Sequence, residues 1–262
     1  MAKQELYTTQ LQAGLGLVDE TLKLLDIWEQ GDKAPDLYKR ALDSGRFAAV
    51  TARRLRNVVS ECFAPRYLKG TPEPALLLQR LKETLPGNAL RQLLFVYTAR
   101  ANPIFGDFVR KVYWRAYTGG QSCVGTEDAK TFVLRAIDDG RTSKRWSEST
   151  VKRVSSYLIG CCTDFGLLES TKSSSRAVTQ LRIENTVALF LAYDLHSKGL
   201  ADNALMVHDD WLLFGLEAND VREELRRLGL QGHVLLQSAG SSVRIEWKYK
   251  TMEELVHVLT QK

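Results

Sequence analysis

The residues best suited to chemistry in this sequence lie in the stretch KRWSESTVKRV, residues 144–154. Two basic pairs, Lys144-Arg145 and Lys152-Arg153, flank a cluster of hydroxyl side chains. Lysine, arginine and serine side chains donate hydrogen bonds to phosphate oxygens, and so do the free amides at the start of a helix. The stretch is therefore either an ordinary solvated helix start or the end of a helix that contacts phosphate.

One long helix is predicted over residues 147–165, and it must position these side chains. Ser147 is a favourable N-cap, and Glu148 suits the positive end of the helix dipole. Apolar side chains recur at helical spacing along one face, at Val151, Val154, Leu158, Cys161 and Phe165. The opposite face carries Ser149, Lys152, Arg153, Ser156 and Gly160. A face this low in profile can approach a DNA groove closely, so we predict DNA contacts from Ser149, Lys152, Arg153 and Ser156.

The elements around this helix follow the order of a winged helix-turn-helix unit. A shorter helix is predicted over residues 126–137, and two strand-like pieces follow the long helix at 167–171 and 178–183. The turn between these pieces reads KSSSR and would form the wing of a hairpin. Lys172 and Arg176, at the two ends of that turn, are predicted to lie near backbone phosphates.

A second basic helix is predicted in the N-terminal half, within AAVTARRLRNVVSECF, residues 48–63. Its buried face consists of Leu55, Val58, Val59, Cys62 and Phe63, at helical spacing. Arg53, Arg56 and Asn57 project away from that face, and such side chains suit phosphates and base edges. These three residues are further candidates for nucleic-acid contact, although a solvated face explains the pattern equally well.

The positive charge of the chain is unevenly distributed. The whole sequence carries a net charge of +5, yet residues 39–69 carry +6, residues 100–118 carry +3 and residues 141–182 carry +5. The remaining residues must therefore carry −9. A basic surface on an otherwise acidic body favours a polyanionic partner.

At 262 residues the chain is long enough for about two domains. Residues 1–120 read as helices broken by short loops, and the double glycine Gly119-Gly120 marks the predicted boundary. Residues 121–262 form the second region, either as one body or as two subunits, 121–200 and 201–262. The last subunit repeats the order of helix and hairpin, with a helix at 218–228, strands at 234–238 and 243–249, and a final helix from Met252.

One short motif is compatible with an enzyme. Glu246 and Lys248 form the Glu-x-Lys pattern of a class of nucleases that use Mg²⁺. However, apolar and charged residues alternate from Val243 to Lys250, which is the pattern of a half-buried strand. The sequence contains no P-loop, G-x-S-x-G or H-E-x-x-H motif. We therefore predict no enzymatic activity, no small-molecule substrate and no cofactor.

The sequence also predicts no metal site, because its four cysteines and four histidines show no metal-ligand spacing. The longest unbroken apolar run, Val187–Tyr193, is far shorter than the roughly 20 residues that span a bilayer. The N-terminal residues show no signal-peptide pattern. We expect a cytoplasmic protein that has no membrane partner.

Four stretches resemble the BrxA family, whose members are small components of BREX bacteriophage-exclusion systems. They are LYTTQLQAGLGLVDET, TARRLR, WSESTVKR with the later FGLLE, and the tail VLLQSAGSSVRIEWKYKTMEEL. The resemblance covers most of the chain, whereas residues 70–100 are generic. It implies a mainly α protein with a NusB-like helical domain at 1–120, followed by a winged-helix-type region with short β-hairpins.

The resemblance also implies a non-catalytic accessory protein that binds double-stranded DNA alongside other BREX components. It supplies no catalytic residues, so the DNA-facing positions named above rest on helical projection. Two alternatives stay open, namely an RNA-binding protein of NusB type and a protein-interaction adaptor within the defence assembly.

Overall fold

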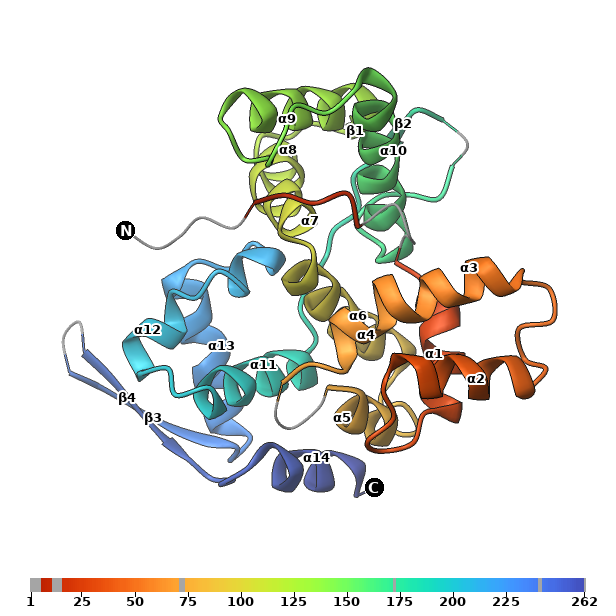
Figure 1. The fold of residues 1–262 in the computed structure, drawn as a ribbon. Coiled ribbons are helices and arrows are strands. Elements are labelled where there is room, and N and C mark those ends of the chain that lie inside the picture. The colour runs from red at the N-terminus through yellow and green to blue at the C-terminus, as the bar shows by residue number, and fades with distance from the viewer. Residues whose placement is uncertain (1–5, 11–15, 71–73, 172, 240–241, 262) are drawn as a thin grey trace. The chain divides into compact units, whose positions relative to one another are not determined.

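The computed structural model of the chain describes residues 6–10, 16–70, 74–171, 173–239 and 242–261. These residues fold mainly into helices, with two antiparallel pairs of short strands (Figure 1). Their contacts group them into two compact units. Unit 1 comprises residues 1–75 and 94–181, and unit 2 comprises residues 76–93 and 182–262. The predicted mainly α class is confirmed.

Unit 1 consists of helices and one small sheet. Its elements are α1 (Val18–Ile27), α2 (Ala34–Asp43), α3 (Ala52–Asn57), α4 (Ala64–Tyr67), the second half of α6 (Gly87–Ala101), α7 (Pro103–Phe108), α8 (Trp114–Thr118), β1 (Cys123–Gly125), α9 (Thr126–Asp138), α10 (Glu148–Asp164) and β2 (Ser175–Ala177). The π-helical turns Val58–Phe63 and Val109–Tyr113 join α3 to α4 and α7 to α8, so each pair continues as one helix.

The core of unit 1 is built around aromatic rings. Phe95, Phe105 and Phe165 form a triangle whose ring centroids lie 5.8, 5.5 and 6.0 Å apart. Ring pairs in this range stabilise a core beyond the burial of their surface. The triangle joins α6 and α7 to the C-terminal end of α10, and α9 packs against α10 as well. The long helix is therefore held firmly on one side.

The two helices α9 and α10 begin at capped positions, close to the predicted ones. The Asp128 carboxylate accepts a hydrogen bond from the Gly125 amide at 2.8 Å, and the Ser147 hydroxyl accepts one from the Thr150 amide at 3.3 Å. Side chains of this kind satisfy amides that have no partner within the helix. Residues 139–147 connect the helices, and this connection is longer than the three or four residues of a helix-turn-helix turn.

The strand pairing in unit 1 differs from the predicted hairpin. β2 pairs with β1, the strand that precedes α9, and Val124 lies opposite Arg176. Between the predicted strands 167–171 and 178–183, only the isolated bridge from Leu168 to Val178 is present among the described residues. The predicted pairing is therefore present only as this bridge, in which the Thr179 amide donates to the Leu167 carbonyl. The pairing of β2 with β1 was not predicted, because β1 is three residues long, which is too short to leave an alternation of apolar and polar residues.

Unit 2 is a helical body that carries the second sheet. Its elements are most of α5 (Pro74–Leu81), the first half of α6, α11 (Asn185–Ser197), α12 (Asp202–Met206), a 3₁₀ turn (Trp211–Phe214), α13 (Ala218–Leu230), β3 (Val234–Ala239), β4 (Ser242–Trp247) and α14 (Met252–Thr260). β3 and β4 form the hairpin predicted for the tail. Gly240 and Ser241, which were predicted at its turn, lie outside the described residues.

The centre of unit 2 is α11, because every residue from Val187 to Leu195 is buried. The Tyr193 hydroxyl donates to the His233 carbonyl at 2.7 Å and accepts from the Lys248 amide at 3.0 Å. The Asp202 carboxylate of α12 accepts from the Ile245 amide of β4 at 2.9 Å. Side chains from two helices therefore satisfy backbone amides of β4 and of the residues after it, which ties the hairpin to the helices.

The predicted domain boundary at Gly119-Gly120 falls inside unit 1. Contacts within a compact unit do not show whether a segment of that unit folds independently. The division into 1–120 and 121–262, with or without a further division after residue 200, therefore stays a prediction.

Candidate nucleic-acid interface

α10 has one fully buried face and one exposed basic face. The predicted apolar stripe of Val151, Val154, Leu158, Cys161 and Phe165 is buried, and none of these residues is more than 3% exposed. On the opposite side Ser149, Lys152, Arg153 and Ser156 are all exposed. Helical projection thus predicted the buried face and the exposure of these four residues, whereas Gly160, predicted on the same face, is half-buried. The four candidate residues of this helix share one surface, and we name them the α10 face.

Lys152 and Arg153 are positive charges that have no counter-ion within the described part of the chain. Among the residues that the structure describes, neither side chain makes a hydrogen bond or an ion pair. Glu148 lies four residues before Lys152, a spacing that often gives an ion pair, yet the Glu148 carboxylate and the Lys152 ammonium do not pair. Unpaired cations on an exposed face are free to bind an external anion.

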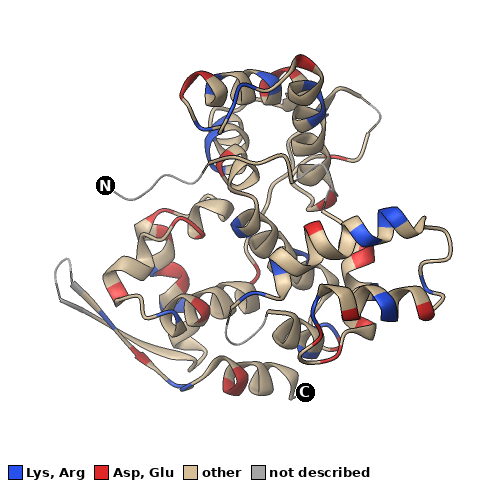
Figure 2. Ribbon diagram, in the orientation of Figure 1, with Lys and Arg blue, Asp and Glu red and all other residues tan. Residues whose placement is uncertain are grey.

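The last two basic residues of α13 are engaged differently. On α13, Arg226 pairs with Glu223 at 2.5 Å and Arg227 pairs with Glu224 at 2.7 Å. Figure 2 shows acidic and basic residues together on α13, whereas blue residues stand alone on α3. The charge of α13 is therefore largely neutralised on its own surface.

The hydroxyl cluster at the start of α10 forms a small network. The Ser147 oxygen lies 3.1 Å from the Ser149 oxygen and 3.0 Å from the Thr150 oxygen. Ser147 also caps the helix, so its lone pairs are used within the protein. Ser149 is exposed and keeps hydrogen-bonding capacity for a partner outside the chain.

The one predicted wing residue that the structure describes, Arg176, does not lie with the α10 face. Arg176 is only half exposed, and its guanidinium donates a hydrogen bond to the Thr163 hydroxyl on α10. Thr163 lies ten residues beyond Arg153, or about 15 Å along the helix axis at 1.5 Å per residue. Lys172 lies outside the described residues. Arg176 thus braces β2 against α10, and this contact could not be read from the order of residues.

The second candidate helix, α3, has the predicted faces. Leu55 and the buried side chains of the following π turn, Val58, Val59, Cys62 and Phe63, are at most 3% exposed. Arg53, Arg56 and Asn57 are exposed. The Arg56 guanidinium lies 5.2 Å from the centre of the Tyr38 ring on α2, which holds its side chain in place by a cation–π contact.

A charged centre at Asp107 was missed by the sequence analysis. Its carboxylate accepts hydrogen bonds from the Tyr7 hydroxyl at 2.6 Å, Lys111 at 2.8 Å and Arg141 at 3.3 Å. Burial by itself would raise the pKa of Asp107, but the hydrogen bonds from Lys111 and Tyr7 and the charges of Lys111 and Arg110 together lower it. Lys111 lies one helical turn from Asp107, whereas Tyr7 and Arg141 lie far away in sequence, so local spacing could have indicated only part of the centre.

The nuclease-like motif has a structural explanation. Glu246 accepts a hydrogen bond from Gln237 across the hairpin at 3.2 Å, and Trp247 stacks on His196 with ring centroids 4.2 Å apart. Within the described ranges, no group of three or more His, Cys, Asp or Glu side chains could hold a metal ion. No described helix is long and apolar enough to cross a membrane.

The fold and this surface define a class: a mainly helical protein with two small antiparallel sheets and exposed basic faces on two of its helices. A family model named BrxA matches residues 5–194, which is more than half of the chain. The protein belongs to the BrxA family. Membership makes it a BREX-associated protein of antiviral defence.

One solved structure has a similar fold at low sequence identity. No curated protein matches the chain. A crystal structure of an uncharacterized protein from Magnetospirillum magneticum is similar, with a TM-score of 0.58, and the match covers 73% of this chain and 94% of the other. The two sequences are 14% identical, so the similarity shows a shared fold and nothing about function.

Proposed function

We propose that the protein is a non-catalytic accessory component of a cytoplasmic BREX assembly, and that it binds double-stranded DNA through the α10 face. The observation that carries this proposal is the pair of exposed cations, Lys152 and Arg153, which have no counter-ion among the described residues. Ser149 and Ser156 beside them are small, so the helix can approach a phosphate backbone closely.

The arrangement around α10 supports a winged-helix interpretation. β1, α9, α10 and β2 follow one another, and β2 returns to pair with β1. In a winged-helix unit the longer second helix enters the groove, which is the role we assign to α10. Wing contacts from Lys172 and Arg176 belong to the same proposal. Because Arg176 already binds Thr163, we expect it to contribute less than Lys152 or Arg153.

RNA is the second candidate partner. The observation that favours it is α3, which presents Arg53, Arg56 and Asn57 and contains no acidic residue. A NusB-like N-terminal domain, proposed from the family resemblance, would use such a helix for RNA. An adaptor that contacts only other BREX components is the remaining alternative, and it requires no nucleic acid.

Fluorescence anisotropy can separate these three functions. The labelled probes are duplex DNA, one of its single strands, and RNA of the same sequence. The variant Lys152→Glu/Arg153→Glu removes two attractions and adds two repulsions, while Lys23→Glu/Lys250→Glu applies the same charge change at exposed lysines on other elements. Neither control lysine has a side-chain partner among the described residues.

We expect the intact protein to prefer duplex DNA, and only the α10 variant to lose binding. Equal loss in both variants would reduce the effect to net charge and would contradict a specific role for α10. Tighter binding of RNA, lost in Arg53→Glu/Arg56→Glu, would favour the RNA-binding function. If the protein binds none of the probes, the adaptor function is the one that remains.

The non-catalytic part of the proposal has its own test. Supercoiled plasmid incubated with the protein and Mg²⁺ should stay supercoiled. Glu246 lies on an exposed strand face, and the described structure has no group of three or more His, Cys, Asp or Glu side chains that could hold the metal ion. Nicking that is lost in Glu246→Ala would contradict it.

A further inference from the structure

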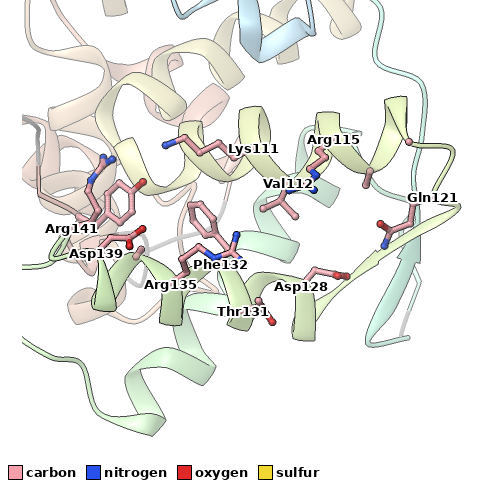
Figure 3. Close-up of a pocket in the computed structure, with 14 residues that line it drawn as sticks. Lys111, Val112, Arg115, Gln121, Asp128, Thr131, Phe132, Arg135, Asp139 and Arg141 are labelled. Carbon is pink, nitrogen blue, oxygen red and sulfur yellow. The ribbon is translucent and has the colours of Figure 1, made fainter.

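A pocket of about 410 Å³ opens between two helices of unit 1, and no residue of the α10 face lines it. One wall comes from the π turn and α8, and the other comes from α9 (Figure 3). The volume falls within the range of about 300–1,000 Å³ that is typical of sites for small ligands.

Two guanidinium groups in this pocket have no partner within the part of the chain that the structure describes. Arg115 lies on α8 and Arg135 lies on α9, and Figure 3 shows them on opposite walls. Among the described residues neither guanidinium makes an ion pair, a hydrogen bond or a ring contact. A guanidinium presents a planar fork of donors that matches the oxygens of a phosphate or a carboxylate. The pocket therefore offers two open anion-binding groups.

Two aromatic side chains also line the pocket. Phe132 and Tyr7 line it, with ring centroids 6.2 Å apart, and the Arg141 guanidinium lies 4.3 Å from the centre of the Tyr7 ring. Tyr7 is held by its hydrogen bond to Asp107 and by its amide, which donates to the Arg141 carbonyl at 2.7 Å. Aromatic rings beside open guanidinium groups suit a ligand that carries both a ring and an anion.

The acidic residues of the pocket do not cancel its charge. Lys111 and Arg141 are already engaged by Asp107, and Asp128 is engaged by the Gly125 amide that it caps. Asp139 is exposed at the rim and forms no ion pair with Arg135, although it follows Arg135 by four residues. The two open arginines thus remain as the anion-binding groups.

We propose that this pocket binds a small aromatic phosphate, namely a nucleotide, with the phosphate on Arg115 and Arg135 and the base against Phe132 and Tyr7. The nucleotide is bound and not chemically converted, so it is a ligand and not a substrate. The site is independent of the α10 face, because none of the residues of that face lines it. Its lining residues range from Tyr7 to Arg141, so sequence spacing alone could not predict it.

Calorimetric titration with AMP, adenosine and inorganic phosphate tests the proposal on the full chain. AMP should bind, and adenosine and phosphate should each bind at least about tenfold more weakly, because each lacks one half of the contacts. Arg115→Ala/Arg135→Ala should weaken AMP binding by about tenfold or more. Arg226→Ala/Arg227→Ala on α13 makes the same change of charge outside the pocket and should bind AMP as the unmodified chain does. Melting temperatures identify any variant that fails to fold.

Three results would overturn the proposal. The first is no heat of binding with AMP at millimolar concentration, from a chain that melts cooperatively. The second is equal affinity for AMP and inorganic phosphate, which would mean that the aromatic rings play no part. The third is a loss of duplex DNA binding in Arg115→Ala/Arg135→Ala as large as the loss of AMP binding. The pocket would then belong to the nucleic-acid surface, whereas unchanged duplex binding supports a separate nucleotide site. As a variant that keeps the charge, Arg115→Lys/Arg135→Lys should retain AMP binding only in part, because lysine cannot form the planar fork.

Discussion

Removing the two unpaired cations of α10 should change the salt dependence of duplex binding by a calculable amount. If Lys152 and Arg153 each contact one phosphate, Lys152→Ala/Arg153→Ala lowers the slope of log K against log salt by about 1.8, at about 0.9 per contact. Between 50 and 200 mM salt, the intact protein should then lose about twelvefold more affinity than the variant loses.

The fold should be unaffected by this change. Both side chains are exposed and make no hydrogen bond or ion pair to any described residue, while Val151 and Val154 beside them stay buried. Exposed helix substitutions of this kind cost under about 0.5 kcal/mol of unfolding free energy. Chemical denaturation of both proteins in the same buffer checks this part.

The assay is anisotropy with a labelled duplex at four or more salt concentrations, and it compares the intact chain, the α10 variant and Lys23→Ala/Lys250→Ala. The control should keep the slope of the intact protein. If the α10 variant keeps that slope as well, the two cations do not contact phosphate, and the start of α10 is an ordinary solvated helix end. An equal change of slope in the control would also refute the assignment.

Three further outcomes follow from contacts within each unit. Phe165→Ala removes one ring of the aromatic triangle and should cost about 3–5 kcal/mol of unfolding free energy, measured by denaturant titration; a cost under about 1 kcal/mol would show that the triangle does not hold α10. Gly16→Ala should cost about 1–3 kcal/mol of unfolding free energy, because its new Cβ would lie 2.6 Å from the Cβ of Asp164. Gly87→Ala is the neutral control, because a Cβ added at Gly87 meets no atom within 4 Å. Burial lowers the pKa of His196, so the unfolded chain binds more protons than the folded chain and stability falls as the pH drops below about 6.5. The melting temperature of His196→Phe should therefore fall less than that of the intact protein between about pH 7.5 and pH 5.5. An equal fall in both proteins would contradict this.

Local sequence patterns were sufficient for the helices that carry the candidate residues. The apolar residues of α10 and α3 recur at helical spacing, and Ser147 supplies the cap, so their faces follow from chain geometry alone. The β3–β4 hairpin was also predictable, because its two strands are adjacent in sequence and one of them alternates strictly.

Only the tertiary structure decided which distant residues meet. β1 is too short to be recognised by itself, and it becomes a strand because the backbone of β2 supplies its hydrogen bonds. Arg176 was predicted to point at phosphate, yet the fold places Thr163 within its reach. The pocket between Arg115 and Arg135 exists because two helices pack side by side, and such packing depends on shape across the whole core and not on the spacing of residues within either helix. The sequence by itself therefore determined the faces of single helices, whereas strand partners, bracing contacts and the pocket depend on the packing of segments that are far apart in the chain.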